Sequence, residues 1–94
     1  MLKVSVLVAA YNEEKHISDC IQSLLVQCYQ KIEIIVVNDG STDNTGRILN
    51  EICKTHPSVR VFHQRNSGKV VAFNHAYEAA SGDLFIFVGA DDYL

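Results

Sequence analysis

The sequence has no apolar run that approaches the roughly 20 residues that a helix needs to cross a membrane. Its start, Met1 to Val4, leads directly into a strand-like run and lacks the long apolar region and cleavage site of a signal peptide. The three cysteines, Cys20, Cys28 and Cys53, are odd in number and show no C-x-x-C spacing, which disfavours a disulfide framework or a zinc site. We therefore expect a cytoplasmic protein with reduced thiols.

Basic residues are too few and too scattered for a nucleic-acid-binding face. The chain has 8 Lys and Arg against 11 Asp and Glu, a formal net charge of −3, and we expect no nucleic-acid partner. No G-x-G-x-x-G follows the first apolar run, Gly68-Lys69 lacks the preceding glycine of a P-loop, and no G-x-S-x-G occurs. A Rossmann dinucleotide site, a P-loop and a hydrolase elbow are all disfavoured.

The sequence does contain enough apolar residues, 48%, for one core. Continuous or alternating apolar runs predict four strands, at Val4–Ala9, Glu33–Asn38, Val59–His63 and Leu84–Val88. Apolar residues with helical spacing fill the three intervals. The first helix is expected to begin at an Asn12 cap, the second at Ser41 or Thr42, and the third at Lys69. The second helix should end before Pro57, and Gly82 is expected to be the C′ glycine of the third. In the third helix the residues that keep helical spacing are Val70, Phe73, Ala76, Tyr77 and Ala80.

This β-α-β-α-β-α-β order predicts an α/β fold, a Rossmann-like three-layer α/β/α domain with a mostly parallel sheet. The run Val59–His63 alternates between apolar and polar residues, which is typical of an edge strand.

In such a sheet every strand-to-helix junction lies at the same rim, where ligands bind. The four junctions bring an aromatic ring, carboxylates, amides, hydroxyls and a lysine. That set suits a nucleoside diphosphate. Tyr11 can pack against a base, and Asp39 can accept a hydrogen bond from the imide N–H of a pyrimidine. Asp91 and Asp92 can hold a ribose hydroxyl and a divalent cation, and Lys69 can face phosphate.

Each of these features alone also has an ordinary structural explanation. Asp39 precedes Gly-Ser-Thr, which is a common turn with a helix cap. The pair Asp91-Asp92 fits solvated loop charge, and Glu13 and Glu14 fit as partners of a helix dipole. The functional interpretation depends on all four junctions being ligand-like together.

Four motifs, in order, carry a resemblance to a known family. They are residues 4–14 (VSVLVAAYNEE), 33–45 (EIIVVNDGSTDNT), 66–69 (NSGK, with Asn74), and 80–83 (ASGD) followed by 90–92 (ADD). With them the chain resembles, over essentially its whole length, the nucleotide-binding half of a family 2 glycosyltransferase. That family has the GT-A fold, inverts the anomeric centre and uses nucleotide sugars.

Residue by residue, the resemblance implies that Ala9 and Tyr11 line the base pocket and that Asp39 bonds the base. Lys69 would lie near the base or the diphosphate. Asp91 would contact the ribose or the metal. Asp92 would bind Mg²⁺ or Mn²⁺ through the diphosphate of a UDP-sugar, and the metal would stabilise the departing nucleoside diphosphate.

The chain departs from the family pattern at Gly89, where many relatives have the first aspartate of Asp-x-Asp, and at Asn38, which replaces a frequent aspartate. The family's general base and acceptor-binding half lie beyond residue 94. We therefore expect 1–94 to be a single donor-binding domain, a fragment of a longer enzyme and inactive alone. The acceptor, a saccharide or a lipid-linked molecule, would bind the missing half, which could place the whole enzyme at the inner face of the membrane.

Two other functions remain open at this point. One is a non-catalytic nucleotide-binding or interaction module of the same fold. The other, less favoured, is a nucleotidyltransferase, since such enzymes carry a Gly-rich basic loop where this chain has Tyr11-Asn12-Glu13-Glu14. The apolar strand Leu84–Val88 would also have an exposed edge, through which we expect a homodimer.

Overall fold

The structure is a computed structural model that describes residues 2–27 and 31–89. Strands and helices alternate along these residues, as β1 Val4–Ala10, α1 Ile17–Gln27, β2 Ile32–Asp39, α2 Thr45–Thr55, β3 Val59–Gln64, α3 Lys69–Ala79 and β4 Leu84–Gly89. The predicted β-α-β-α-β-α-β order is confirmed.

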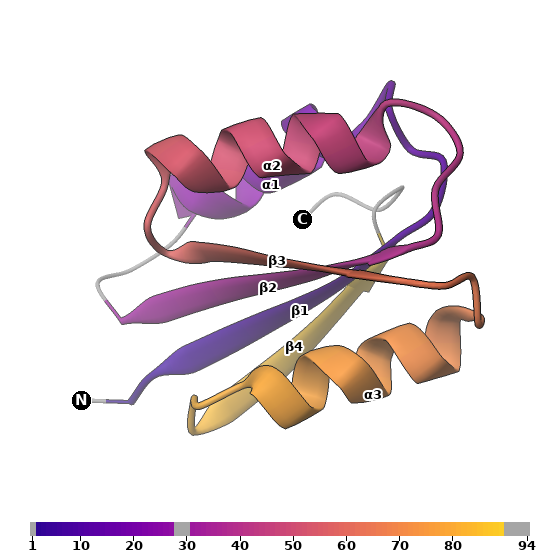
Figure 1. Cartoon of the computed structure of the whole chain (residues 1–94). Coiled ribbons are helices and arrows are strands. Elements are labelled where there is room, and N and C mark those ends of the chain that lie inside the picture. The colour runs from indigo at the N-terminus through magenta and orange to yellow at the C-terminus, as the bar shows by residue number, and fades with distance from the viewer. Residues whose placement is uncertain (1, 28–30, 90–94) are drawn as a thin grey trace.

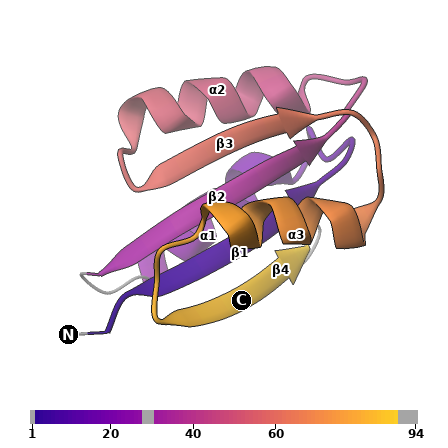
Figure 2. The ribbon, with the colours of Figure 1, turned by 60° about the horizontal axis from the view of Figure 1, so that its bottom comes forward.

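The four strands form one parallel sheet in the order β3-β2-β1-β4. Helices α1 and α2 cover one face of this sheet and α3 covers the other (Figure 1), which confirms the three-layer α/β/α architecture. The rotated view shows α3 in front of the strands and α1 behind them (Figure 2). As predicted, β3 lies at an edge.

Strand β2 supplies the centre of both apolar layers because its side chains alternate between the two faces. Ile34 and Val36 pack with α1 and α2, whereas Ile35 and Val37 pack with Ala72 of α3. All four aliphatic residues are fully buried. The continuous apolar run is therefore a strand covered on both sides, which fixes the position of the polar residues that end it.

The first two helices begin later than the sequence predicted. Asn12 is not the cap of α1: it has a φ of +50°, and its Oδ1 accepts from the backbone N–H of Thr42 at 2.8 Å. Helix α2 begins at Thr45. Ser41 Oγ accepts from Asn12 N–H in the loop after β1, and Asp43 accepts both from Glu14 N–H of that loop and from Thr45 N–H at the start of α2. In both cases a contact between loops takes the polar group that was expected to cap a helix. The end of the first predicted helix, at Cys28, lies outside the described residues.

The prediction for the end of α3 is also corrected. Gly82 is not a left-handed C′ residue; it packs against β1, where a Cβ would come within 2.9 Å of the backbone N of Ser5. Val70 and Tyr77 are exposed, and the buried residues of α3 are Ala72 and Ala76. Small side chains on the inner face let α3 lie close to the sheet.

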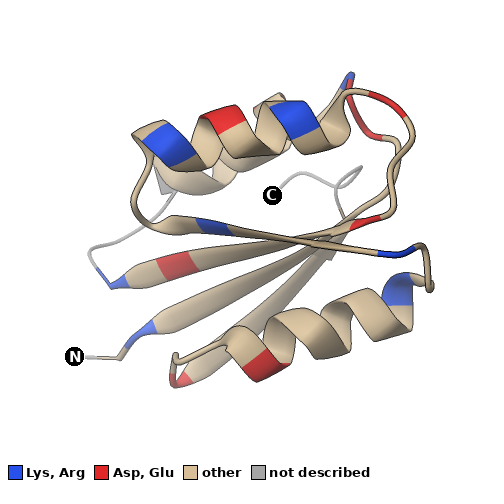
Figure 3. Ribbon diagram, in the orientation of Figure 1, with Lys and Arg blue, Asp and Glu red and all other residues tan. Residues whose placement is uncertain are grey.

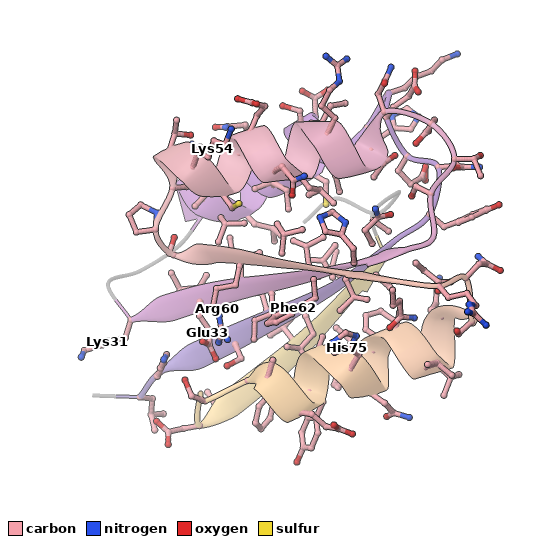
Figure 4. The ribbon with its side chains drawn as sticks, viewed as in Figure 1. Lys31, Glu33, Lys54, Arg60, Phe62 and His75 are labelled. Atoms are coloured by element: carbon pink, nitrogen blue, oxygen red, sulfur yellow. The ribbon has the colours of Figure 1, made fainter. Side chains whose placement is uncertain are left out.

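At the amino end of the sheet, Glu33 of β2 is buried with a complete set of partners. Its Oε2 accepts from Ser5 Oγ and from the backbone N–H of Ser81, both at 2.6 Å. Lys3 Nζ and Arg60 Nη1 lie 3.5 and 3.8 Å from Oε1. Figure 4 shows Glu33 and Arg60 side by side at this end. These contacts join β1, β2, β3 and the α3–β4 connection.

Candidate functional site

A pocket of ≈ 360 Å³ opens at the carboxyl ends of β1 and β2. The residues that line it come from three strand-to-helix junctions and are Ala9, Ala10, Tyr11, Glu13, Asp39, Asn66, Gly68 and Lys69. The parallel sheet brings these segments together because all its strands end at the same rim. The pocket thus lies where the sequence predicted a ligand.

Asp39 ends β2 and is 4% exposed. Its Oδ1 accepts from Gln64 Nε2 at 2.9 Å and from the backbone N–H of Ser67 at 2.7 Å. Its Oδ2 accepts from the backbone N–H of Gly68 at 3.0 Å and, at a longer 3.4 Å, from Asn66 Nδ2. One carboxylate therefore organises the whole β3–α3 loop from within the pocket wall.

These hydrogen bonds keep Asp39 ionised. Burial alone would raise the pKa of this carboxyl, but the donors from Gln64, Ser67 and Gly68 outweigh it, and the pKa is lowered. An ionised carboxylate only accepts hydrogen bonds, so its ligand partner must be a donor.

Gly40 allows the β3–α3 loop to approach the end of β2. It has a φ of +71°, and a Cβ at this position would lie 2.5 Å from the backbone N of Asn66. Any other residue would meet both backbone strain and this close contact. Gly40 is therefore needed for Asn66 to reach its place in the pocket wall.

The loops after β1 and β2 hold each other through reciprocal hydrogen bonds. Backbone N–H groups of the first loop donate to side chains of the second: Asn12 to Ser41 Oγ at 3.0 Å, and Glu13 to Thr45 Oγ1 at 2.9 Å. In return, Glu14 Oε1 accepts from the backbone N–H of Asn44 at 3.0 Å. This arrangement fixes Tyr11 and Glu13 at the pocket.

Asn38, the departure from a frequent aspartate, has a structural role here. Its Oδ1 accepts from the backbone N–H of Ser41 at 3.2 Å, which leaves its Nδ2 to donate to His63 Nδ1 at 3.0 Å. His63 Nε2 then donates to Asn50 Oδ1 at 2.8 Å. The Asn38 amide thus links β2 to β3 and, through His63, to α2. Both bonds require the His63 tautomer that carries its proton on Nε2.

Four of the six predicted site residues meet in the pocket: Ala9, Tyr11, Asp39 and Lys69. Tyr11 is 49% exposed, and Lys69 is the exposed first residue of α3. The other two, Asp91 and Asp92, lie outside the described residues, so their assignment stays a prediction.

Four residues that line the pocket are not predicted from the sequence: Ala10, Glu13, Asn66 and Gly68. Glu13, whose sequence position predicts a helix-dipole partner, precedes α1 and lines the pocket. Asn66 and Gly68 were visible as a turn motif. Their position between a strand end and a helix start was the signal that could have placed them.

Charge is unevenly distributed around this rim. Figure 3 shows acidic residues in the loops after β1 and β2, and basic residues in the loop before α3 and at its start.

Among residues 2–27 and 31–89, no group of three or more His, Cys, Asp or Glu is arranged to hold a metal ion. Over the same residues, no helix has the length and apolar character to span a bilayer.

Comparison with known proteins decides the family. The sequence profile described as Glycosyl transferase family 2 matches residues 5–94. The chain belongs to this family. It is 42% identical over 90 residues to YibD of Escherichia coli (strain K12), an uncharacterized glycosyltransferase, and this match covers 96% of the chain and 26% of YibD. It is 42% identical over 92 residues to the glycosyltransferase GlyG of Streptococcus pneumoniae serotype 4, covering 97% of the chain and 31% of GlyG.

Solved structures of glycosyltransferases share the fold. The mannosyltransferase PcManGT of Pyrobaculum calidifontis, in complex with GDP-Man and Mn²⁺, matches with a TM-score of 0.91 and 30% identity over 98% of the chain and 28% of its own. S. aureus TarS 1–349 in complex with UDP matches with a TM-score of 0.87 and 38% identity, again over 98% of the chain and 28% of its own. The chain thus spans about a third or less of the length of these family members.

Proposed function

We propose that this chain is the donor-binding part of a glycosyltransferase that moves a sugar from a nucleoside-diphosphate sugar, with a UDP-sugar favoured, to an acceptor hydroxyl. The observation that carries the proposal is the pocket in which Ala9, Tyr11, Asp39 and Lys69 meet. Membership of family 2 and the likeness to structures solved with GDP-Man and with UDP support it.

The base would enter beside Tyr11 and Asp39. The half-exposed ring of Tyr11 offers an apolar face for stacking, and the buried, ionised carboxylate of Asp39 accepts the N–H of the base. Ala9 and Ala10 leave space for the base in the pocket, because their side chains are small. These residues bind and orient the nucleoside without reacting with it.

The diphosphate would lie toward Lys69 at the first turn of α3, where the positive end of the helix dipole and the side-chain charge both favour an anion. Lys69 alone does not balance a diphosphate beside the carboxylates of Glu13 and Asp39. A divalent cation suits this charge pattern, and Asp91 and Asp92 follow β4, whose last residue Gly89 pairs with Ala9 of the pocket.

We assign Mg²⁺ or Mn²⁺ to Asp92, with Asp91 on the ribose or the same ion, because paired carboxylates are ligands that hard cations prefer. When bound, the ion would supply Lewis-acid stabilisation of the leaving diphosphate. The general base and the acceptor, a saccharide or a lipid-linked molecule, would belong to the rest of a longer enzyme.

Titration calorimetry with UDP, with and without Mn²⁺, tests this proposal on the wild-type chain and on Asp92→Ala. The matched control is Asp19→Ala, on the exposed face of α1. We expect metal-dependent binding in the wild type and the control, and its loss in Asp92→Ala. Binding that ignores both the metal and Asp92 would overturn the metal assignment, and no UDP binding by the wild type would overturn the donor site.

A non-catalytic nucleotide-binding module is the second candidate, favoured by Gly89 in place of an aspartate. Restoring the carboxylate with Gly89→Asp distinguishes the two. If the chain is a donor half with a complete metal site, Gly89→Asp changes Mn²⁺-dependent UDP affinity little, whereas a large gain would favour the module that has lost a ligand.

We further propose that the chain self-associates through β4. Within the described residues β4 has a strand neighbour on one side only, and Leu84, Phe85, Ile86 and Phe87 are between 37% and 55% exposed. An unpaired apolar edge of this kind pairs readily with a second copy. Sedimentation at tens of micromolar should show dimers, and a strictly monomeric profile would contradict the proposal.

For cellular location we propose the cytoplasm, with the longer enzyme at the inner face of the membrane and in cell-envelope polysaccharide synthesis. The cysteine spacing, which does not suit a disulfide framework, supports a reducing compartment. Fractionation of cells that express the full-length gene tests it, and recovery outside the cytoplasm and its membrane face would contradict it.

A further inference from the structure

The two oxygens of the Asp39 carboxylate are not equally available. Oδ1 accepts two short hydrogen bonds, from Gln64 Nε2 at 2.9 Å and from Ser67 N–H at 2.7 Å. Oδ2 accepts one short bond, from Gly68 N–H at 3.0 Å, and one long contact, from Asn66 Nδ2 at 3.4 Å. A carboxylate oxygen accepts about two hydrogen bonds. Oδ1 is therefore filled, whereas Oδ2 has a weak contact that a ligand can replace.

The positions of the donors show which oxygen faces the ligand. Asn66 and Gly68, the partners of Oδ2, line the pocket. Among the described residues that form the pocket wall, Gln64 and Ser67, the partners of Oδ1, do not occur. Oδ2 is thus the oxygen on the pocket side, and Oδ1 is held from behind.

A second contact fixes the orientation of the Gln64 amide. Its Oε1 lies 2.8 Å from His75 Nδ1. Since Gln64 Nε2 donates to Asp39, Oε1 must accept, and His75 must donate. The His75 ring packs on the Phe62 ring, with 5.3 Å between the two ring centroids, and lies below β3 in the view of Figure 4. The relay from His75 through Gln64 to Asp39 is therefore held by packing as well as by hydrogen bonds.

We propose that Gln64 is a specificity-determining residue of the donor site: it occupies Oδ1 of Asp39, so that the pocket accepts uracil and disfavours guanine. This inference depends on the proposed function, since it concerns the base of the donor. Structures of the same fold were solved with GDP-Man and with UDP, so the fold alone does not select the base.

The chemistry of the two bases explains the selection. Uracil has a single imide N–H between two carbonyls. It matches one acceptor position on Oδ2 beside Asn66 Nδ2, which keeps its 3.0 Å bond to the backbone O of Asp39 and can turn its second N–H from Oδ2 to a uracil carbonyl. Guanine has two adjacent donors, N1–H and the exocyclic amino group, which require both oxygens of a carboxylate. With Oδ1 filled by Gln64 and Ser67, the second guanine donor would be buried without a partner, which is unfavourable.

The test is a titration of UDP and of GDP against three forms of the chain: wild type, Gln64→Met and Gln22→Met. Methionine approximates the size of glutamine without its donor, and Gln22 is the matched control on the exposed face of α1. We expect the wild type and the control to prefer UDP over GDP by about tenfold or more, because a bound guanine would leave one of its donors without a partner. In Gln64→Met the preference should fall to about threefold or less, because the carboxylate loses the bond that holds Oδ1 away from the pocket and can then turn Oδ1 toward the second guanine donor.

A second variant, His75→Leu, keeps Gln64 but releases its amide. The UDP-to-GDP ratio should fall in the same direction and by less. Because the readout is a ratio of two affinities, a general loss of folded protein does not change it.

Each outcome separates this inference from the proposed function. An unchanged ratio in Gln64→Met, or a wild type that prefers GDP, would overturn the role of Gln64 and leave the donor site standing. A wild type that binds neither nucleotide would overturn both.

Discussion

Strand β2 carries a buried carboxylate at each end, and the two ends serve different purposes. Glu33, near the amino end, is 6% exposed, and Asp39, at the carboxyl end, is 4% exposed. In each case burial alone would raise the pKa, but hydrogen bonds outweigh it and the pKa is lowered: from Ser5 and Ser81 to Glu33, with the charge of Lys3, and from Gln64, Ser67 and Gly68 to Asp39. Both side chains are therefore ionised, and each accepts several hydrogen bonds.

The difference lies in charge and access. Glu33 has two cationic neighbours within 4 Å, Lys3 and Arg60, and it joins separate elements of the fold. Asp39 has neutral donors from the end of β3 and from the loop after it, and it lines the pocket. A paired, enclosed carboxylate stabilises a fold, whereas one bound only by exchangeable neutral donors at a pocket retains negative charge for a ligand.

Removing the carboxylate at the closed end should have the largest effect on stability. We expect Glu33→Ala to lower the free energy of unfolding by about 3 kcal/mol, because it leaves the buried Ser5 hydroxyl and the Ser81 N–H without their acceptor. Urea unfolding measures this, with Glu78→Ala on the exposed face of α3 as the control. A loss equal to that of the control would show that the Glu33 cluster does not hold the fold.

Acid should weaken the fold through both ends of β2. Because the pKa of each carboxyl is lower in the folded chain, their contribution is complete above the ordinary carboxyl range and is lost as the pH falls through the lowered values. We expect the unfolding free energy to be level from neutral pH to about 5 and to decrease below about 4. The unfolding free energy of Glu33→Gln should be lower at neutral pH and should decrease less steeply with acid. A slope equal to that of the wild type would contradict this.

The smallest effect should come from the exposed rim. We expect Lys69→Met to weaken UDP binding about fivefold, or about 1 kcal/mol, while uridine, which lacks phosphate, binds as before. The difference should shrink as salt increases, because the lysine is exposed. Lys31→Met, at the amino end of the sheet, is the matched control (Figure 4). Equal losses for UDP and uridine would place Lys69 at the base instead of the diphosphate.

The fold was predictable because its signals are local. The Ile34–Val37 run and the helical spacing around it specify a buried strand and its crossovers, and the alternation in Val59–His63 specifies an edge strand. The same local signals placed Tyr11, Asp39 and Lys69 at one rim, since parallel strands end together, and the family resemblance added Ala9; all four line the pocket.

The errors concern residues whose partners are distant in sequence. Asn12 looks like a cap until the loop with Thr42, 30 residues later, satisfies it instead. Gly82 looks like a C′ glycine, but its smallness serves contact with Ser5. Spacing within one segment contains no information about such contacts, because they arise only when the sheet brings the segments together.

Titration of UDP against Asp39→Asn and Glu33→Gln, in the presence of Mn²⁺, tests the functional difference between the two ends of β2 most directly. Each variant exchanges one buried carboxylate of the same strand for the matching amide. With affinities corrected for the folded fraction, we expect Glu33→Gln to bind UDP as the wild type does and Asp39→Asn to bind at least about tenfold more weakly, since it loses a charged acceptor. Wild-type affinity in Asp39→Asn would contradict the assignment of this carboxylate to the base.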